Sequence, residues 1–222
     1  MNLKRRAATP IEPPQLSNVS AANPQHVPSL EAQAAYVQQA WAGLHFDAQE
    51  AENASFEQLD VRNTSFQDAN LPLLECADCR FDITDFANCS LNKAYLCRVE
   101  FIGCRLIGTK LTDADLADIR FVRCNARLMR CWTSLARTIR FEQCDLQEAS
   151  FDGSDLSGAV FHKCNLSGAD LRNAKLKGTD LRGSQIAGIK VHGKDLAGVI
   201  VDPTQALELI QLFGVQVQTE DL

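Results

Sequence analysis

Residues 141–200 read FEQCDLQEASFDGSDLSGAVFHKCNLSGADLRNAKLKGTDLRGSQIAGIKVHGKDLAGVI, and this stretch decides the fold. Divided into blocks of five, every block opens with Phe, Leu, Ile or Val, and Gly is frequent two residues later. A period of five matches neither the 3.6-residue period of an amphipathic helix nor the two-residue alternation of a strand. The repeating unit is therefore predicted to be a short extended bridge followed by a turn.

The five-residue register extends well beyond this stretch. Counting by fives from Phe46 to Val201 gives 32 positions without an insertion, and 27 of them are Leu, Phe, Val or Ile. Ten of the eleven Phe lie in this register, and ten of the twelve Gly lie two residues after it, where a turn uses positive φ. We expect each register residue to point inward, together with the small residue two positions before it.

Identical side chains recur at every twentieth residue. Phenylalanine does so at Phe81, Phe101, Phe121, Phe141 and Phe161, and cysteine does so at Cys104, Cys124, Cys144 and Cys164. Like side chains at a fixed period indicate that they stack on successive repeats of one structural unit. A coil of 20 residues is therefore predicted, with four five-residue blocks on four sides.

These blocks resemble the A(D/N)LXX pattern of the pentapeptide repeat family, over about two thirds of the chain. The resemblance implies an all-β fold, a right-handed quadrilateral β-helix that here would have about eight coils. It says little about function, because one fold serves several roles.

The composition fits one soluble domain of 222 residues with a net charge of −6. This mildly acidic balance argues against direct nucleic-acid binding, and no apolar run is long enough to span a membrane. No apolar segment follows the basic N-terminus, which argues against a secretory signal. The nine Cys fit buried positions of the repeat rather than a disulfide framework, so a reducing cytoplasm is expected.

Two segments precede the predicted β-helix of residues 45–201. Residues 1–28 are rich in Pro, Ala, Asn and Gln, and we expect a flexible N-terminal arm. Residues 29–44 are predicted to form a helix that Ser29 caps and Gly43 ends. Its apolar stripe would cover the open first coil or, alternatively, bind a partner; the stripe consists of Leu30, Ala34, Val37, Trp41 and Leu44.

Residues 202–222 depart from the repeat. Asp202, Pro203 and Gln205 form a helix start, and Gly214 ends a helix that runs to Phe213. Residues 215–218 alternate like a short edge strand. This tail resembles the one through which Qnr-type and MfpA-type pentapeptide repeat proteins dimerise, which implies a homodimer with an interface at Ala206, Leu207, Leu209, Ile210, Leu212 and Phe213; a monomeric cap is the alternative. Ala206, Leu209, Ile210 and Phe213 share a face that is expected to plug the last coil.

The coil from Arg120 to Arg140 differs most from the repeat. Its register residues Ala126, Cys131 and Ala136 are undersized, and Met129 is expected to fill the resulting gap. Trp132 falls at an outward position among six arginines: Arg120, Arg123, Arg127, Arg130, Arg137 and Arg140. These residues are a candidate surface for a partner or an anion, or alternatively a solvated basic belt with the indole stacked beneath an arginine.

The sequence offers no sign of catalysis. Its four His are scattered, no Cys/His spacing matches a zinc site, and no Gly-rich phosphate loop occurs. We therefore predict no catalytic residue, no metal and no cofactor, since a filled rod leaves no cleft that excludes water.

Two functions remain open at this point. The first is a non-catalytic scaffold that binds a protein partner. The second follows from the resemblance to Qnr-type and MfpA-type proteins: a rod that mimics DNA, binds DNA gyrase or topoisomerase IV and protects against drugs such as fluoroquinolones. Two of the four sides carry an excess of acidic residues, which fits DNA mimicry, but the arginine-rich coil interrupts them.

Overall fold

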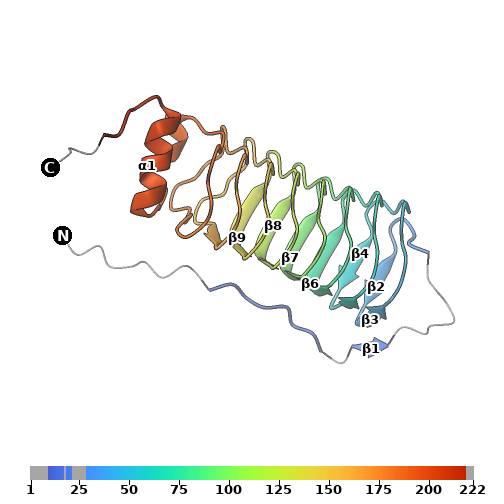
Figure 1. Ribbon diagram of the computed structural model, residues 1–222. Coiled ribbons are helices and arrows are strands. Elements are labelled where there is room, and N and C mark those ends of the chain that lie inside the picture. The colour runs from blue at the N-terminus through green and yellow to red at the C-terminus, as the bar shows by residue number, and fades with distance from the viewer. Residues whose placement is uncertain (1–9, 18, 22–28, 219–222) are drawn as a thin grey trace.

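The computed structural model describes residues 10–17, 19–21 and 29–218, and these form an all-β parallel solenoid with one α-helix at its C-terminal end (Figure 1). A two-residue strand, β1 (Ser20–Ala21), precedes the coils. The coils contain β2 (Ala35–Val37), β3 (Gln39–Ala42), β4 (Ser55–Glu57), β5 (Asp60–Arg62), β6 (Glu75–Asp82), β7 (Tyr95–Ile102), β8 (Asp115–Val122), β9 (Leu135–Glu142) and β10 (Val160–His162). A 3-10 helix, η1 (Gly193–Leu196), and the α-helix α1 (Pro203–Leu212) follow.

Every parallel pair within the coils joins residues 20 positions apart, as the sequence predicts. Phe101 pairs with Phe121, and Phe121 pairs with Phe141. Pairing recurs at four places within each 20 residues, either in the strands or as isolated bridges. One column of bridges runs through His45, Ser65, Asp85, Arg105, Asn125, Asp145, Asn165 and Gln185. The predicted coil of four five-residue blocks is thus present.

The register residues fill the interior. The predicted phenylalanine ladder is buried and stacked: ring centroids of Phe81 and Phe101 lie 5.2 Å apart, and those of Phe141 and Phe161 lie 5.0 Å apart. Offset or parallel aromatic stacking at this distance adds to the free energy gained by burial. The ladder therefore couples each coil to the next through the core.

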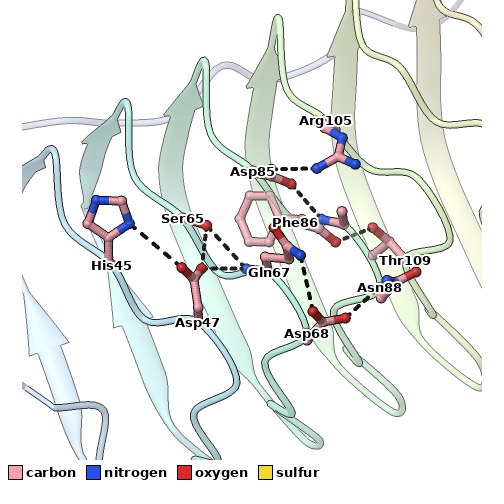
Figure 2. A network of polar contacts seen from close by, with 11 residues as sticks. His45, Asp47, Ser65, Gln67, Asp68, Asp85, Phe86, Asn88, Arg105 and Thr109 are labelled. Atoms are coloured by element: carbon pink, nitrogen blue, oxygen red, sulfur yellow. Dashed lines mark hydrogen bonds and ion pairs between the residues drawn. The ribbon is translucent and has the colours of Figure 1, made fainter.

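The small inward residues also form hydrogen bonds. The Cys104 thiol donates to the carbonyl oxygen of Phe81, 23 positions earlier, at 3.3 Å, and Cys124 bonds Phe101 in the same way. The hydroxyl of Thr109 donates to the Phe86 carbonyl at 2.7 Å (Figure 2). Cys, Thr and Ser are thus interchangeable here because each fits the space and donates one hydrogen atom. The sequence predicted their burial but not this bond.

Turns between the blocks use positive φ, by glycine and by other residues alike. Gly108 has a φ of 67°, and an added Cβ would lie 2.7 Å from the Asn88 Oδ1 atom. Both features favour glycine at this corner, although Asn88 and Leu128 adopt positive φ at the same place on the neighbouring coils. Ile83 adopts a φ of 50° although β-branched residues disfavour the left-handed region, so the pairing of neighbouring coils imposes this conformation.

The predicted helix over residues 29–44 is wrong. Residues 35–37 and 39–42 are β2 and β3, which pair with β4 and β5 of the next coil. Tyr36 and Trp41 are buried in the same register as Phe46, and their rings lie 5.4 Å apart. Trp41 of the predicted helical stripe lies in the five-residue register, whereas Val37 of that stripe is exposed, and pairing with the next coil favours the repeat.

The C-terminal helix agrees with the prediction only in part. The capping box is present: Asp202 accepts from the Gln205 backbone N–H, and the Gln205 side chain accepts from the Asp202 N–H. Gln205 also donates to the carbonyl oxygens of Leu181 and Ser184, and with Leu209 it closes the last coil. The predicted strand at residues 215–218 has no regular structure, and Ile210 and Phe213 are exposed rather than plugging the coil.

The N-terminal arm was predicted to be flexible over residues 1–28. Residues 1–9, 18 and 22–28 lie outside the described residues, but residues 10–17 run along the outside of the coils (Figure 1). The Gln15 N–H donates to the Asp78 carboxylate at 3.0 Å, and β1 pairs in parallel with β3. The described part of the arm is therefore docked, which corrects the prediction for those residues.

Candidate interaction surface

The arginine-rich coil divides into a paired half and an open half. Arg120 donates to Glu142 at 3.0 Å and Arg137 donates to Asp115 at 2.6 Å, so their charges are compensated locally. Hydrogen bonding to Glu142 raises the pKa of Arg120, and the same contact lowers the pKa of Glu142. Arg140 lies 3.9 Å from Glu142. Arg120 and Arg137 are thus paired with carboxylates on neighbouring coils, and Arg140 lies near a carboxylate of its own strand.

The open half has the remaining three arginines. Within the described part of the chain, the guanidinium groups of Arg123, Arg127 and Arg130 form no ion pair. Arg130 lies over the Trp132 indole, 5.4 Å from the ring centroid, and the indole N–H donates to the Ser150 hydroxyl at 2.7 Å. Trp132 is stacked beneath an arginine, as expected for a solvated basic belt. It nevertheless remains 40% exposed, so it is also accessible to a partner.

A groove of about 540 Å³ lies beside this half of the coil. Lys110 and Arg130 are ladder partners on consecutive coils, so two positive charges lie side by side at its edge. Like charges at this spacing repel each other, and an anionic group between them would relieve the repulsion. The groove is lined by Asp68, Asn88, Gly108, Lys110, Leu128, Arg130, Glu148 and Ser150.

The core beneath this surface is as the sequence indicates. The register positions of this coil hold the small residues Ala126, Cys131 and Ala136, which are buried. Met129 is also buried, with 0% exposure. A flexible thioether fills irregular space in this way. The interior beneath the arginines is therefore filled, although its side chains differ from those of the other coils.

The acidic sides of the solenoid are interrupted by cations. Arg105 donates to Asp85 at 2.8 Å, whereas Asp68 accepts a hydrogen bond from the neutral Asn88 amide (Figure 2). On the opposite side, Arg98 forms two hydrogen bonds with Asp78, at 2.7 and 2.6 Å. Negative charge is thus present but broken along both sides.

The C-terminal tail presents a second surface. Of the six residues predicted for the interface, Leu207, Ile210, Leu212 and Phe213 are exposed, by 40–47%. Leu209 is buried against the last coil and Ala206 is half-buried, so the structure places these two in the cap. The tail thus combines a cap on one face with exposed apolar residues on the other.

Sequence reasoning missed the contact between the arm and the coils. Gln15, Asp78 and Arg98 form one hydrogen-bonded network, although Gln15 and Asp78 are 63 positions apart. The short outward residues of a repeat carry no signal for such a distant partner. Among the described residues, no cluster of His, Cys, Asp and Glu is arranged to hold a metal ion. Their helices are also too short or too polar to cross a membrane.

Comparisons with known proteins give the following picture. A family model described as pentapeptide repeats matches residues 144–183, and one described as a pentapeptide repeat region matches residues 94–159. No curated protein matches the chain.

Two solved structures are similar to this chain at low identity. HetL, a pentapeptide repeat protein involved in heterocyst differentiation regulation in the cyanobacterium Nostoc, is 17% identical, with 77% of this chain and 90% of HetL covered and a TM-score of 0.47. A trypsin-treated variant of QnrB1, a plasmid-mediated fluoroquinolone resistance protein, is 20% identical, with 84% and 100% covered and a TM-score of 0.46. At these identities neither protein's role transfers to this chain.

Proposed function

Because the chain is a pentapeptide repeat protein, we propose that it acts as a non-catalytic scaffold that binds a protein partner. The observation that carries this proposal is the open half of the arginine-rich coil, where Arg123, Arg127 and Arg130 form no ion pair with any described residue and Trp132 is accessible. Arg and Trp dominate binding energy at protein interfaces, and an aromatic ring bounded by cations fits an acidic protein surface.

The fold supports a binding role rather than chemistry. The interior is filled by stacked side chains, and the hollows along the described residues are open grooves at the coil corners. A reaction that must exclude water needs a more enclosed site. We propose that the rod is right-handed and four-sided, as in the family, and that it works in the cytoplasm, where its thiols stay reduced.

Self-association through the tail is part of the proposal. The exposed Leu207, Ile210, Leu212 and Phe213 form an apolar surface at the end of the rod, and a two-fold axis would pair this surface with itself. A homodimer would present two copies of the arginine-rich surface to its partner.

The test is photo-crosslinking with the full chain in its native cells. A photoreactive amino acid replaces Trp132 in one variant and Arg172, which occupies the same place two coils later, in the control. We expect a discrete adduct from position 132 that Arg127→Glu with Arg130→Glu removes, and none from position 172. No adduct at 132, or equal adducts at both positions, would refute this surface.

The second candidate function is binding of DNA gyrase or topoisomerase IV as a DNA mimic. The exposed apolar tail and the acidic residues of two sides favour it, while Arg98 and Arg105 on those sides weaken it, because a mimic of DNA needs continuous negative charge. A supercoiling assay with purified protein, with and without a fluoroquinolone, tests it. Inhibition of gyrase or rescue from the drug at micromolar protein would support this function, and no effect at high excess would exclude it.

A further inference from the structure

The described arm crosses the coils as one extended segment. Ile11 lies beside Arg120 and Arg140, Gln15 bonds Asp78, and Ser17 bonds Gln58. The arm thus passes successive coils in the reverse of their order before β1 pairs with β3. The spacing fits an extended chain, because a coil step of about 4.8 Å is covered by roughly one and a half residues.

The surface under the arm is rich in arginine. Arg98, Arg120 and Arg140 lie on consecutive coils next to the strip, each beside a carboxylate of the solenoid. The Asp78 carboxylate, and more weakly Glu12 of the arm, hold the pKa of Arg98 above its usual value. Glu12, the single acidic residue of the strip, stands between Ile11 and Pro13, and these two residues line a hollow together with Arg120 and Arg140. We name this surface the arm track: Asp78, Arg98, Glu100, Arg120, Arg140 and Glu142.

The arm is held loosely. Among the described residues, the Gln15 N–H is the one main-chain donor of residues 10–17 that bonds the solenoid, and three prolines in the strip have no N–H. Ile11 and Pro14 are half-buried, and the other six residues are exposed. Hollows of about 280 and 350 Å³ remain between Ile11 and the arginines. Few contacts and imperfect packing make the strip easy to displace.

We propose that the arm track is a second binding surface, for an extended segment of a partner protein that contains prolines and an acidic residue, and that residues 10–17 occupy it as a built-in competitor. The arm itself shows the chemistry that the track accepts: an apolar residue and a proline beside the arginine side chains, an acidic residue between them, and a main-chain donor toward Asp78. The track lies on other five-residue blocks of the coil than Arg127, Arg130 and Trp132, so the two surfaces are tested separately.

The experiment uses full-length protein and a fluorescein-labelled peptide of residues 10–17, PIEPPQLS, as the probe. Ile11→Gly with Gln15→Pro loosens the arm, because it removes the apolar contact and the bond to Asp78. We expect this variant to bind the peptide at least about tenfold more tightly than the unmodified protein, since apparent affinity scales with the fraction of free track. A peptide with Glu12→Gln should bind the variant several-fold more weakly.

Leu16→Gly is the matched control, because Leu16 is an exposed residue of the same strip. It should bind the peptide as weakly as the unmodified protein does. Equal peptide affinity for the loosened and unmodified proteins, or no binding to the loosened protein, would overturn the proposal. Thermal melting checks the fold, and Gln15→Pro alone provides a milder variant that leaves every coil residue intact.

Discussion

The rings of Phe121 and Phe141 lie 4.6 Å apart between centroids, and their planes are inclined by only 4°. Both side chains are buried, and each ring also stacks on the next member of the ladder. In a repeat protein the stability is a sum of repeat and interface terms, so this ladder contributes to every interface that it crosses.

Replacing Phe121 should therefore be costly. Phe121→Ala removes two stacking partners and leaves a cavity, and we expect the free energy of unfolding to fall by about 3–5 kcal/mol. Urea denaturation followed by circular dichroism measures this. The control Leu73→Ala, at an exposed position, should change it by less than about 1 kcal/mol. Equal effects of the two changes would show that the ladder does not dominate stability.

Asp78 should make stability depend on pH. The Arg98 guanidinium, followed by the Gln15 N–H, lowers the pKa of this carboxyl against the opposing effect of burial. A depressed folded pKa contributes stability that is fully present above the unfolded pKa of about 4 and is lost as pH falls through the lower, folded value. Asp78→Asn should cost about 1–3 kcal/mol at neutral pH, because it breaks a largely buried pair.

The difference in the free energy of unfolding between the unmodified protein and Asp78→Asn should shrink as pH falls below about 4. Denaturant titration at several pH values measures this difference. Asp82→Asn is the control, since its carboxylate lies 3.8 Å from the Arg80 guanidinium and is more exposed. A difference that stays constant down to acid unfolding would contradict the role given to Asp78.

The thiols should differ sharply in reactivity. Cys97 is half-buried, whereas the other eight cysteines are buried. Burial raises the pKa of Cys131 to about 12 and also raises that of Cys89, which keeps both thiols protonated. Ellman's reagent should label one thiol per folded chain, and Cys97→Ser should abolish that reaction. Rapid labelling of several thiols in the folded protein would show that the coils open easily.

The tail should control the oligomeric state. Leu212→Asp with Phe213→Ser places charge and polarity on the exposed apolar surface, and light scattering should show the mass falling from a dimer to one chain of 24.4 kDa. The cap should survive, because Gln205 and Leu209 still close the last coil. Gln211→Asp, a charge at another exposed position of the helix, is the control. An unchanged mass would refute this interface.

The sequence was a reliable guide wherever an interaction repeats along the chain. The pairing of Phe101 with Phe121 follows from their spacing, because equal residues at a 20-residue period occupy equal places on stacked coils. The helix start at Asp202 and Gln205 was also predictable, because a capping box is a local signal. The same reasoning failed at Trp41, which belongs both to the predicted helical stripe and to the five-residue register.

By itself, the sequence determined the coil, its period and the side chains that fill it, because these depend on neighbours at fixed separations. Only the tertiary structure decided which arginines are compensated, where Gln15 docks and how Gln205 caps the last coil. These contacts join single residues from different coils or from outside them. Whether these contacts form depends on the distance between the two residues in the folded rod and on the desolvation of their charges. A periodic sequence pattern does not predict contacts of this kind.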